Sequence, residues 1–598
     1  MCGIFALLNN NTTFTKEEIS MAFEFGNNRG PEDSEFVKYD NSLDIGFKRL
    51  AINGLNKQSR QPMTIDNITL ICNGEIYNYK ELFKEINVTP KTQSDCEIII
   101  HLYKLYGIKQ TLMLLDGYFS FLLYDFRTSK TEPTVIVARD PFGVRPLFIL
   151  EQNPICNEDK NKNNSNNYYS TRENIIGFAS ELKMLNPLLN SKKGQLKYYE
   201  PTIPYPKHVS GIKPSFTISQ YPPGCYSVYK THNSEWINVV KNISYHYNNV
   251  EPNLCNSYTK ELHNETLLKI YNNLNNAIKK RVKGTTERPI ACLLSGGLDS
   301  SLVTALVNKY HEGQLDTFSI GMEGSEDLKY AKEVANYLNT NHTEIVLTPD
   351  EFFDAIPDVI RTIESYDTTT VRASVGNYLV GKYISENTDI KVVFNGDGSD
   401  EITGGYLYFL KAPNALEFDT ECRRLINEIH FFDCLRSDRC IAAHGLEPRT
   451  PFLDRTFVEE YFAIPLCLRF PQCLSLHSDD NRPICEKMLL REAIIENEKD
   501  LLPLHIIKRK KEAFSDGVSG NSGSWFSIIG DKVSNYDTNT STITDYEHNT
   551  PQTKEQLYYR KIYDEFYPNT AKTIPYFWMP KYVNAKDASA RTLDFYNE

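Results

Sequence analysis

The sequence has no apolar stretch that could span a membrane. No run of about 18 apolar residues occurs in its 598 residues. The basic segment and long apolar core of a secretory signal are also missing, because Asn9, Asn10 and Asn11 follow only a short apolar run. We therefore expect a cytoplasmic protein with neither a membrane partner nor an export route.

Paired cysteine spacings are missing as well. The 13 cysteines are an odd number, and none of them stand at the spacing of a zinc motif. Without an export signal, reduced thiols packed as small apolar side chains are the expected state. This pattern excludes a disulfide framework and a structural zinc site.

Positive charge is in short supply. The formal net charge is -12, and the clearest basic patch, Lys508–Lys511, is only four residues long. Such a surface repels a nucleic-acid backbone. We therefore expect no nucleic-acid partner.

What is present is the composition of an ordinary globular protein, with 40% hydrophobic and 24% charged residues. A chain of this length exceeds one hydrophobic core, and two large domains fit best. The first domain is assigned to residues 2–210, with an Asn-rich surface insertion, expected to be mobile, at 152–174. Residues 211–260 are assigned as a connecting region.

Short apolar runs separated by turn residues predict a strand-rich layered first domain, with one helix over Glu97–Tyr106. The predicted strands are Ile68–Cys72, Phe119–Tyr124, Val135–Ala138, Pro146–Leu150 and Ile175–Phe178, with further signals around Phe216 and over Cys225–Tyr229.

The period changes in the second half. From Leu262 onward, apolar residues recur about every 3.6 positions, which predicts a helix. Apolar runs at Ile290–Leu294, Thr317–Ile320 and Val392–Phe394 then alternate with helical segments. This alternation is typical of a parallel sheet covered by helices. We assign this domain to 261–560, and a C-terminal tail without a periodic signal to 561–598.

A cysteine at position 2 suggests a nucleophile. If Met1 is removed, the thiol of Cys2 stands on the N-terminal residue. An α-amine has a pKa of about 8, so it can act as a base toward that thiol near neutral pH. The rival interpretation is a small second residue that merely favours methionine excision, and on Cys2 alone the rival is preferred.

The strongest motif lies between a predicted strand and a helix. In Ser295-Gly296-Gly297-Leu298-Asp299-Ser300, glycines expose backbone amides, the helix start is positive, and serines add hydroxyl donors. These features predict a phosphate cradle, although not of the Walker type, which needs a lysine here. Asp299 beside phosphates predicts a divalent cation such as Mg²⁺. A plain glycine turn with a capping serine explains fewer of the six residues.

A second acidic loop, Asn395–Glu401, follows the predicted strand at Val392–Phe394. Loops after the carboxyl ends of parallel strands meet at the ligand crevice, so both loops are expected to face one nucleotide. An EF-hand is set aside because its spacing and terminal glutamate are missing.

Taken together, these segments resemble the glutamine-hydrolysing asparagine synthetases, from Cys2 to Ala590-Arg591-Thr592-Leu593. The resemblance implies an α+β N-terminal Ntn-hydrolase sandwich with αββα layers, followed by an α/β parallel-sheet nucleotide-binding domain with additional helices. It implies synthesis of L-asparagine from L-aspartate, L-glutamine and ATP through a β-aspartyl-AMP intermediate. Ammonia would pass internally, and AMP, pyrophosphate and L-glutamate would be released. A homodimer is common in that family.

In the first half, the similarity rests on Cys2-Gly3-Ile4, Arg29-Gly30-Pro31, Arg49-Leu50-Ala51-Ile52, Asn73-Gly74-Glu75-Ile76-Tyr77-Asn78 and Ser94-Asp95. It implies that Cys2 attacks the glutamine amide while the Asn73 side chain and the Gly74 amide stabilise the oxyanion. Alone, Arg49 or Asp95 would be a solvated surface charge. The predicted glutamine site consists of Arg49, Leu50, Ala51, Ile52, Asn53, Asn73, Gly74, Glu75 and Asp95. Arg49 would grip the α-carboxylate, and the two acids the α-ammonium.

In the second half, the similarity implies an ATP site formed by Leu294, Ser295, Gly296, Gly297, Leu298, Asp299, Ser300, Ile320, Asn395 and Gly396. Asp299 and Asp400 would bind Mg²⁺ and pyrophosphate. Arg372, in the stretch Glu364–Arg372, would bind a carboxylate of aspartate. Lys511 would neutralise charge as pyrophosphate leaves, which explains the basic patch.

The chain departs from that family at Asp397, where the family usually has a glutamate thought to assist ammonia attack. A side chain one methylene shorter can slow amidation, because a displacement of about 1 Å can cost about 100-fold in rate. Glu32 also replaces the usual aspartate after Arg29-Gly30-Pro31, a milder change.

Two rival functions remain. The first is a related synthetase that amidates a different carboxylate; a phosphoribosyl amidotransferase would fit the first half alone, but the Ser295–Ser300 loop argues against it. The second is a regulatory or storage homologue that binds nucleotide without efficient turnover, for which Asp397 is the best support. Against it stand the intact residues Cys2, Arg49, Asn73, Asp95, Asp299, Asp400 and Lys511.

Overall fold

The structure is a computed structural model that describes residues 1–39, 42–128, 132–152, 174–189, 216–246, 251–254, 258–285, 287–476, 484–534 and 546–596. Apart from Gln152 and Asn174, the predicted insertion at 152–174 lies outside these residues, as does the boundary at residue 210. None of the helices in these ranges combines the length and the apolar character needed to cross a bilayer.

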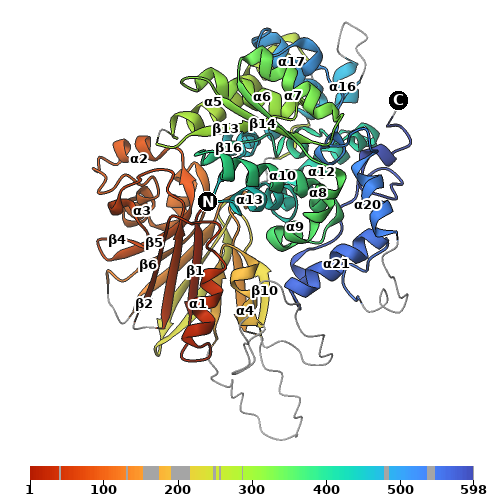
Figure 1. The fold of residues 1–598 in the computed structure, drawn as a ribbon. Helices are drawn as coiled ribbons and strands as arrows, with labels where there is room; N and C mark the ends of the chain where they lie inside the picture. The colour runs from red at the N-terminus through yellow and green to blue at the C-terminus, as the bar shows by residue number, and fades with distance from the viewer. Residues whose placement is uncertain are drawn as a thin grey trace, which may run out of the picture.

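The first half contains two six-stranded antiparallel sheets, with strand orders β10-β8-β9-β1-β3-β2 and β12-β11-β7-β6-β5-β4 (Figure 1). The strands are β1 (Gly3–Leu8), β2 (Asp33–Tyr39), β3 (Leu43–Arg49), β4 (Met63–Ile65), β5 (Ile68–Ile76), β6 (Gly117–Asp125), β7 (Thr134–Arg139), β8 (Phe148–Gln152), β9 (Ile176–Ala179), β10 (Phe216–Gln220), β11 (Cys225–His232) and β12 (Glu235–Ser244). The predicted strands are confirmed.

The two sheets pack face to face, and helices cover their outer faces. Ile4 and Ile45 of the first sheet and Ile71 and Leu122 of the second share one buried cluster. The covering helices are α1 (Lys16–Glu24) and α4 (Asn186–Leu189) on the first sheet, and α2 (Tyr79–Glu85) and α3 (Glu97–Leu114) on the second. The order of layers is helix, sheet, sheet, helix. The predicted helix matches the part of α3 before its break at Gly107, where φ is 73°.

Strands β10, β11 and β12 fall in the range assigned to a connecting region. Each pairs inside the first half, β10 with β8, and β11 with both β7 and β12. The antiparallel layers therefore continue to Ser244.

The second half is built on five parallel strands in the order β15-β14-β13-β16-β17, which confirms the predicted parallel sheet. The strands are β13 (Ile290–Leu293), β14 (Asp316–Gly321), β15 (Asn341–Val346), β16 (Val392–Phe394) and β17 (Glu447–Arg449). Along β13, Ile290 and Cys292 pack with one set of helices and Ala291 with another, as the alternation of side chains across a sheet requires.

Helices cover both faces of this sheet (Figure 1). The helices described in this half are α5 (Lys260–Lys283), α6 (Leu298–Tyr310), α7 (Glu326–Leu338), α8 (Pro349–Asp354), α9 (Ile356–Ile363), α10 (Thr368–Asn387), α11 (Ser399–Thr403), α12 (Ala415–Glu428), α13 (Asp433–Ala442), α14 (Arg455–Ala463), α15 (Leu466–Arg469), α16 (Pro471–Ser475), α17 (Met488–Asn497), α18 (Leu504–Ile507), α19 (Phe514–Gly517), α20 (Trp525–Val533) and α21 (Lys554–Phe566). Of these, α6, α7, α10 and α13 pack directly on the strands. Helix α21 runs through the assigned start of the tail at 561.

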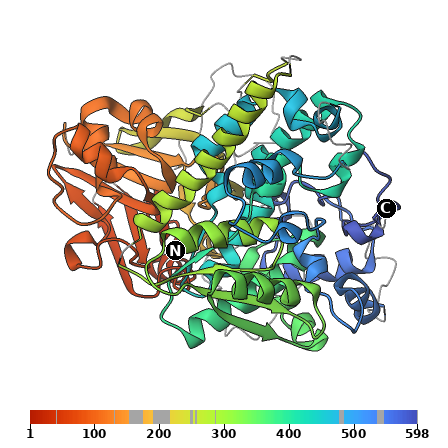
Figure 2. The ribbon, with the colours of Figure 1, turned by 90° about the horizontal axis from the view of Figure 1, so that it is seen from above.

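The two halves lie side by side and share a buried boundary (Figure 2). Arg281 of α5 donates to the Tyr118 hydroxyl of β6 at 2.7 Å and to the Asp454 carboxylate at 2.7 Å. The Tyr118 hydroxyl in turn donates to the Thr450 carbonyl at 2.6 Å. Because these groups are buried, each needs its partner, so they fix the relative position of the halves.

Replacing Arg281 with alanine should lower the free energy of unfolding by about 3 kcal/mol. This value is the lower end of the cost of breaking a buried ion pair, because Lys280 still contacts Asp454 at 2.5 Å. Lys283→Ala on the same helix, whose ammonium is 52% exposed, is the matched control and should change it by less than about 0.5 kcal/mol. Urea denaturation measures both, and equal midpoints for the two variants would contradict the assignment.

Candidate active sites

Cys2 lies at the start of β1, at the boundary between the halves. Its thiol donates to the Leu50 carbonyl at 3.4 Å, and burial raises its pKa to about 11. The amine of Met1 is buried and donates to the Leu446 carbonyl of the second half at 3.0 Å. Burial lowers the pKa of that amine to about 5, so near neutral pH the amine is a neutral base beside a neutral thiol.

Asn73 of β5 is fully buried, and neither its amide nitrogen nor its amide oxygen has a hydrogen-bond partner. An unpaired buried amide costs about 1 to 3 kcal/mol, so such a group is expected where a ligand completes it. The adjacent Gly74 leaves no room for a side chain, because a Cβ there would lie 2.4 Å from the Tyr118 carbonyl oxygen. This arrangement suits an oxyanion site.

The two acids predicted for the glutamine ammonium are buried together. Asn53 donates to Glu75 at 2.8 Å, and the Ile76 amide donates to Asp95 at 2.7 Å. Burial raises the pKa of Asp95 to about 6, and burial together with the charge of Asp95 holds the pKa of Glu75 well above its usual value. Glu447 interacts electrostatically with both Cys2 and Asp95, so its carboxylate lies within electrostatic range of both groups.

The guanidinium of Arg49 is buried beside this cluster, at the end of β3. It donates to the backbone carbonyls of Gly54 and, at 3.3 Å, of Asn56, and it lowers the pKa of Cys2 electrostatically. The structure therefore brings Arg49, Leu50 and Cys2 together.

In the second half, the glycine-rich loop leads into α6 as predicted. Gly296 adopts φ 70°, and a Cβ there would lie 2.4 Å from Tyr330 Cβ, so only glycine fits. The hydroxyls of Ser295 and Ser300 are 2.9 Å apart, and the Ser295 amide donates to Ser300 at 3.1 Å. Leu294 directly follows β13, and its backbone amide donates to the carbonyl of Phe318 in β14 at 2.8 Å. Ile320 lies two residues further along the same strand.

The two loops meet as expected, while a shared nucleotide between them stays a prediction. Ser399 donates to Asp299 at 2.8 Å, and Gly396 lies so close to Asp299 that a Cβ there would be 2.9 Å from its carbonyl carbon. The side chain of Asn395 donates to Ser437 of α13 at 2.7 Å, which fixes its orientation.

Two lysines lie between the aspartates of these loops. Lys487 contacts Asp299 and, at 2.6 Å, Asp400, while Lys511 contacts Asp400 at 2.5 Å. The Lys487 ammonium is 1% exposed. Although burial opposes both shifts, the two lysines hold the pKa of Asp400 below its usual value, and Asp400 and Asp299 hold that of Lys511 above it.

The donors at this point fit Mg²⁺. Carboxylate oxygens of Asp299 and Asp400 are the hard ligands that this ion prefers, and magnesium is commonly held by one or two carboxylates together with substrate phosphates. Within the described ranges, His, Cys, Asp and Glu form no cluster of three or more that could hold a metal by itself. A shared site between protein and phosphate is therefore the arrangement that these residues allow.

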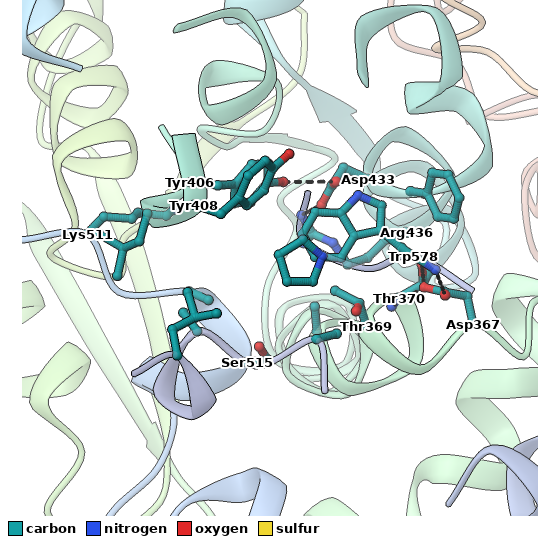
Figure 3. Close-up of a pocket in the computed structure, with 18 residues that line it drawn as sticks. Asp367, Thr369, Thr370, Tyr406, Tyr408, Asp433, Arg436, Lys511, Ser515 and Trp578 are labelled. Atoms are coloured by element: carbon teal, nitrogen blue, oxygen red, sulfur yellow. Dashed lines mark hydrogen bonds and ion pairs between the residues drawn. The ribbon is translucent and has the colours of Figure 1, made fainter. Parts of the chain in front are cut away.

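A cavity of about 70 Å³ opens beside the lysines (Figure 3). Tyr406, Asp433 and Lys511 line it, and the Tyr406 hydroxyl is 3.3 Å from Asp433. Arg436, also in the wall, donates to Asp397 at 2.7 Å and to Asp433 at 2.9 Å. The second carboxylate oxygen of Asp397 is buried and has no hydrogen-bond partner.

Comparison with known families and relatives agrees with this geometry. The family described as asparagine synthase matches residues 269–418 and 410–585, and the glutamine amidotransferase domain family matches residues 1–238. Proteins named asparagine synthetase (glutamine-hydrolyzing) are similar along the whole chain. Those of Rattus norvegicus and Cricetulus griseus are 39% identical and that of Homo sapiens 38%, each match covering 100% of this chain and 99% of the relative.

The chain belongs to the glutamine-hydrolysing asparagine synthetases. The predicted family is thereby confirmed, and with it a ligase family that uses glutamine. The roles of the individual site residues remain predictions.

Arg372, the residue predicted to bind aspartate, does not line the cavity. Its guanidinium donates to Glu555 at 2.8 and 2.5 Å and to Asp587 at 2.6 and 2.9 Å. Four of its five N–H donors are already used, so a substrate carboxylate could form two hydrogen bonds to it only by displacing one of these partners.

Several residues at the two sites were missed by sequence reasoning. Lys487 stands alone in its segment, without a flanking motif, so nothing in the sequence singles it out. Arg436, Asp433, Glu447 and Arg449 come from the region between 430 and 450, which carries no glycine-rich or repeated acidic signal. Their importance follows from where the chain places them.

The glutamine affinity of the first half should depend on the ionisation of Asp95. Its carboxylate can hold the substrate ammonium only above its pKa of about 6, so KM for glutamine should rise about 10-fold when the pH falls to about 5. Asp95→Asn should give a high KM without this pH dependence. The control Glu85→Gln, at an exposed position of the same half, should follow the unchanged protein. Glutamate release measures KM, and a KM of the unchanged protein that stays flat between these pH values would contradict the assignment.

Proposed function

We propose that the protein synthesises L-asparagine from L-aspartate, ATP and L-glutamine through a β-aspartyl-AMP intermediate, and releases AMP, pyrophosphate and L-glutamate. One observation carries the proposal. The Asp299–Lys487–Asp400–Lys511 cluster lies beside a cavity that Lys511 lines. In the other half, the partly buried Cys2 packs against a cluster that includes Ile71 of β5, the strand that carries the unpaired Asn73 amide. Two such centres in one chain suit one reaction that releases ammonia and another that consumes it.

In the first half, Cys2 would attack the side-chain amide of glutamine. The buried position of Asn73 supports it, with the Gly74 backbone amide, as the oxyanion donor, because donors fixed in a dry site are worth more than donors in water. Arg49 would bind the α-carboxylate, and Glu75 and Asp95 the α-ammonium. The helix, sheet, sheet, helix layering supports the assignment of this half to the Ntn hydrolases.

In the second half, the loop Ser295–Ser300 would hold the phosphates of ATP, with Leu294, Ile320, Asn395 and Gly396 against the nucleoside. Asp299 and Asp400 would hold Mg²⁺, which when bound neutralises phosphate charge. Lys487 and Lys511 lie where pyrophosphate would leave and supply positive charge to it. Activation as an acyl-adenylate is needed because a free carboxylate is unreactive toward ammonia.

Internal transfer of ammonia would keep it from becoming ammonium in water. The described junction contains the fully buried Arg145, which forms an ion pair with Glu447 at 3.5 Å, and the fully buried Arg449, which forms one with Glu75 at 3.4 Å. A route for ammonia across this junction would therefore pass charged groups as well as apolar ones. We also propose a cytoplasmic enzyme and a homodimer.

Purified protein supplied with amide-labelled glutamine, aspartate, ATP and magnesium should form labelled asparagine and AMP in equal amounts. ADP in place of AMP would overturn adenylation, and nucleotide binding without product would support the regulatory or storage alternative. Cys2→Ala should abolish glutamine use and keep activity with ammonium salts, because only the nucleophile is lost. Cys473→Ala, a partly exposed thiol of the second half, is the control and should keep both activities. Loss of both activities in Cys2→Ala would contradict the division of labour.

The replacement Asp397→Glu tests whether the shorter side chain limits amidation. If a carboxylate must reach the attacking ammonia, the extra methylene should raise asparagine formation from ammonium salts, by up to about 100-fold. Asp389→Glu, at an exposed position before β16, is the matched control and should have no effect. A fall in rate would mean that the Arg436 contact at 2.7 Å already places Asp397 correctly.

A further inference from the structure

The end of the chain forms one wall of the cavity in the second half. Trp578, Pro580, Ala588, Ala590 and Leu593 all line the cavity, together with Tyr406, Asp433 and Lys511. Figure 3 shows Trp578 between the two labelled tyrosines and Asp367. We call residues 576–593 the C-terminal wall. Without it, this side of the cavity would open to water.

Trp578 fixes one end of the C-terminal wall. Its backbone amide donates to Asp367 at 2.7 Å, and Asp367 also caps α10 through the Thr370 amide at 2.9 Å. The indole ring lies 5.5 Å from the Tyr406 ring and 6.1 Å from the Tyr408 ring, within the range of favourable aromatic contact. The wall is thus tied to the start of α10.

Charged contacts hold the other end of the wall. Arg591 donates to Glu512 at 2.9 and 2.6 Å, and Ser589 donates to Asp516 at 2.9 Å. Glu512 directly follows Lys511, the lysine on Asp400, and Asp516 lies in α19, the helix that comes next. The wall therefore touches the segment that lies at the predicted pyrophosphate site.

Arg372 connects this wall to α21. Its planar guanidinium holds Asp587 through two hydrogen bonds and Glu555 through two more, and its side chain is 3% exposed. A fork of this shape can hold two carboxylates at fixed angles, which a lysine cannot do. Arg372 lies on α10 one helical turn after Thr369, which lines the cavity, but Arg372 itself is not part of the lining. Its effect on the cavity is therefore indirect.

We infer that the cavity takes the aspartate, that Arg372 is a positioning residue that seats the C-terminal wall through Asp587, and that this wall excludes water from the cavity. The inference rests on the proposed function. An acyl-adenylate is attacked by water as well as by ammonia. The water oxygen bonds to the acyl carbon, and the bond from that carbon to the AMP oxygen breaks. Both protons of the water are lost, one to solvent and the other to solvent or to the AMP phosphate, and aspartate and AMP are released. A seated wall favours ammonia, because it lets fewer water molecules reach the acyl carbon.

The test uses Asp587→Ala and Asp587→Asn in the full-length protein. Both variants should lower kcat/KM for aspartate by about 10-fold to 100-fold, because the wall is displaced. Both should also raise the ratio of AMP to asparagine above equimolar, which mere loss of stability would not do. Asp594→Ala, at an exposed position just beyond the wall, is the matched control and should keep the equimolar ratio.

A double-mutant cycle assigns the role of Arg372. If it acts through Asp587, Arg372→Ala combined with Asp587→Ala should be no worse than Arg372→Ala alone, and Arg372→Lys should be intermediate. If it binds aspartate directly, Asp587→Ala should leave KM unchanged or lower it, and the ratio should stay equimolar. That outcome, or an effect of Asp587→Ala no larger than that of Asp594→Ala, would overturn the inference.

Failure of the proposed function gives a different result. In that case the unchanged protein forms no asparagine and AMP, whereas failure of the inference leaves a competent enzyme whose product ratio does not respond to Asp587. Glutamate release from glutamine, which belongs to the other half, should be the same in every variant and shows that each one has folded.

Discussion

Buried charge pairing across the boundary of the two halves is the constraint on which the two sites depend. Arg29 is fully buried and donates to the Cys2 carbonyl at 2.8 Å, to Glu181 at 3.0 Å and to Asp438 of α13 at 2.7 Å. Removing one partner would leave an uncompensated charge in the interior, at a cost of about 3 to 5 kcal/mol. The Cys2 backbone is therefore held by the second half as well as by its own strand.

Glu364 is a buried charged residue of the second half that binds the first half. It adopts φ 58° at the end of α9, accepts the backbone amides of Leu182 and Lys183 from the first half, and contacts Arg439 at 2.6 Å. Burial raises its pKa, and Arg439 opposes the shift. The contacts of its carboxylate, which join the two halves, offset the backbone strain of a non-glycine residue in the left-handed region.

The two predicted sites use buried polarity in different ways. At Asn73 a donor is left unpaired, which suits a charge that appears only during a reaction. At the other site, Lys487 and Lys511 are already paired with Asp299 and Asp400. Phosphates could replace the aspartates as partners of the lysines while a cation replaces the lysines as the partner of the aspartates, so that no charge is left unpaired. Family membership fits both arrangements, since the amidotransferase and synthase families each match one half.

The sequence by itself determined the periodic elements and the local motifs, because period and glycine placement are properties of short segments. The strands Ile68–Cys72 and Val392–Phe394, the turn at Gly296 and the meeting of the two loops followed from it. Tertiary structure alone decided the pairing of β10 to β12 within the first half, the place of Lys487, and the carboxylate partners of Arg372. Asp587 is 215 residues from Arg372, and a contact over that distance leaves no local pattern for sequence reasoning to find.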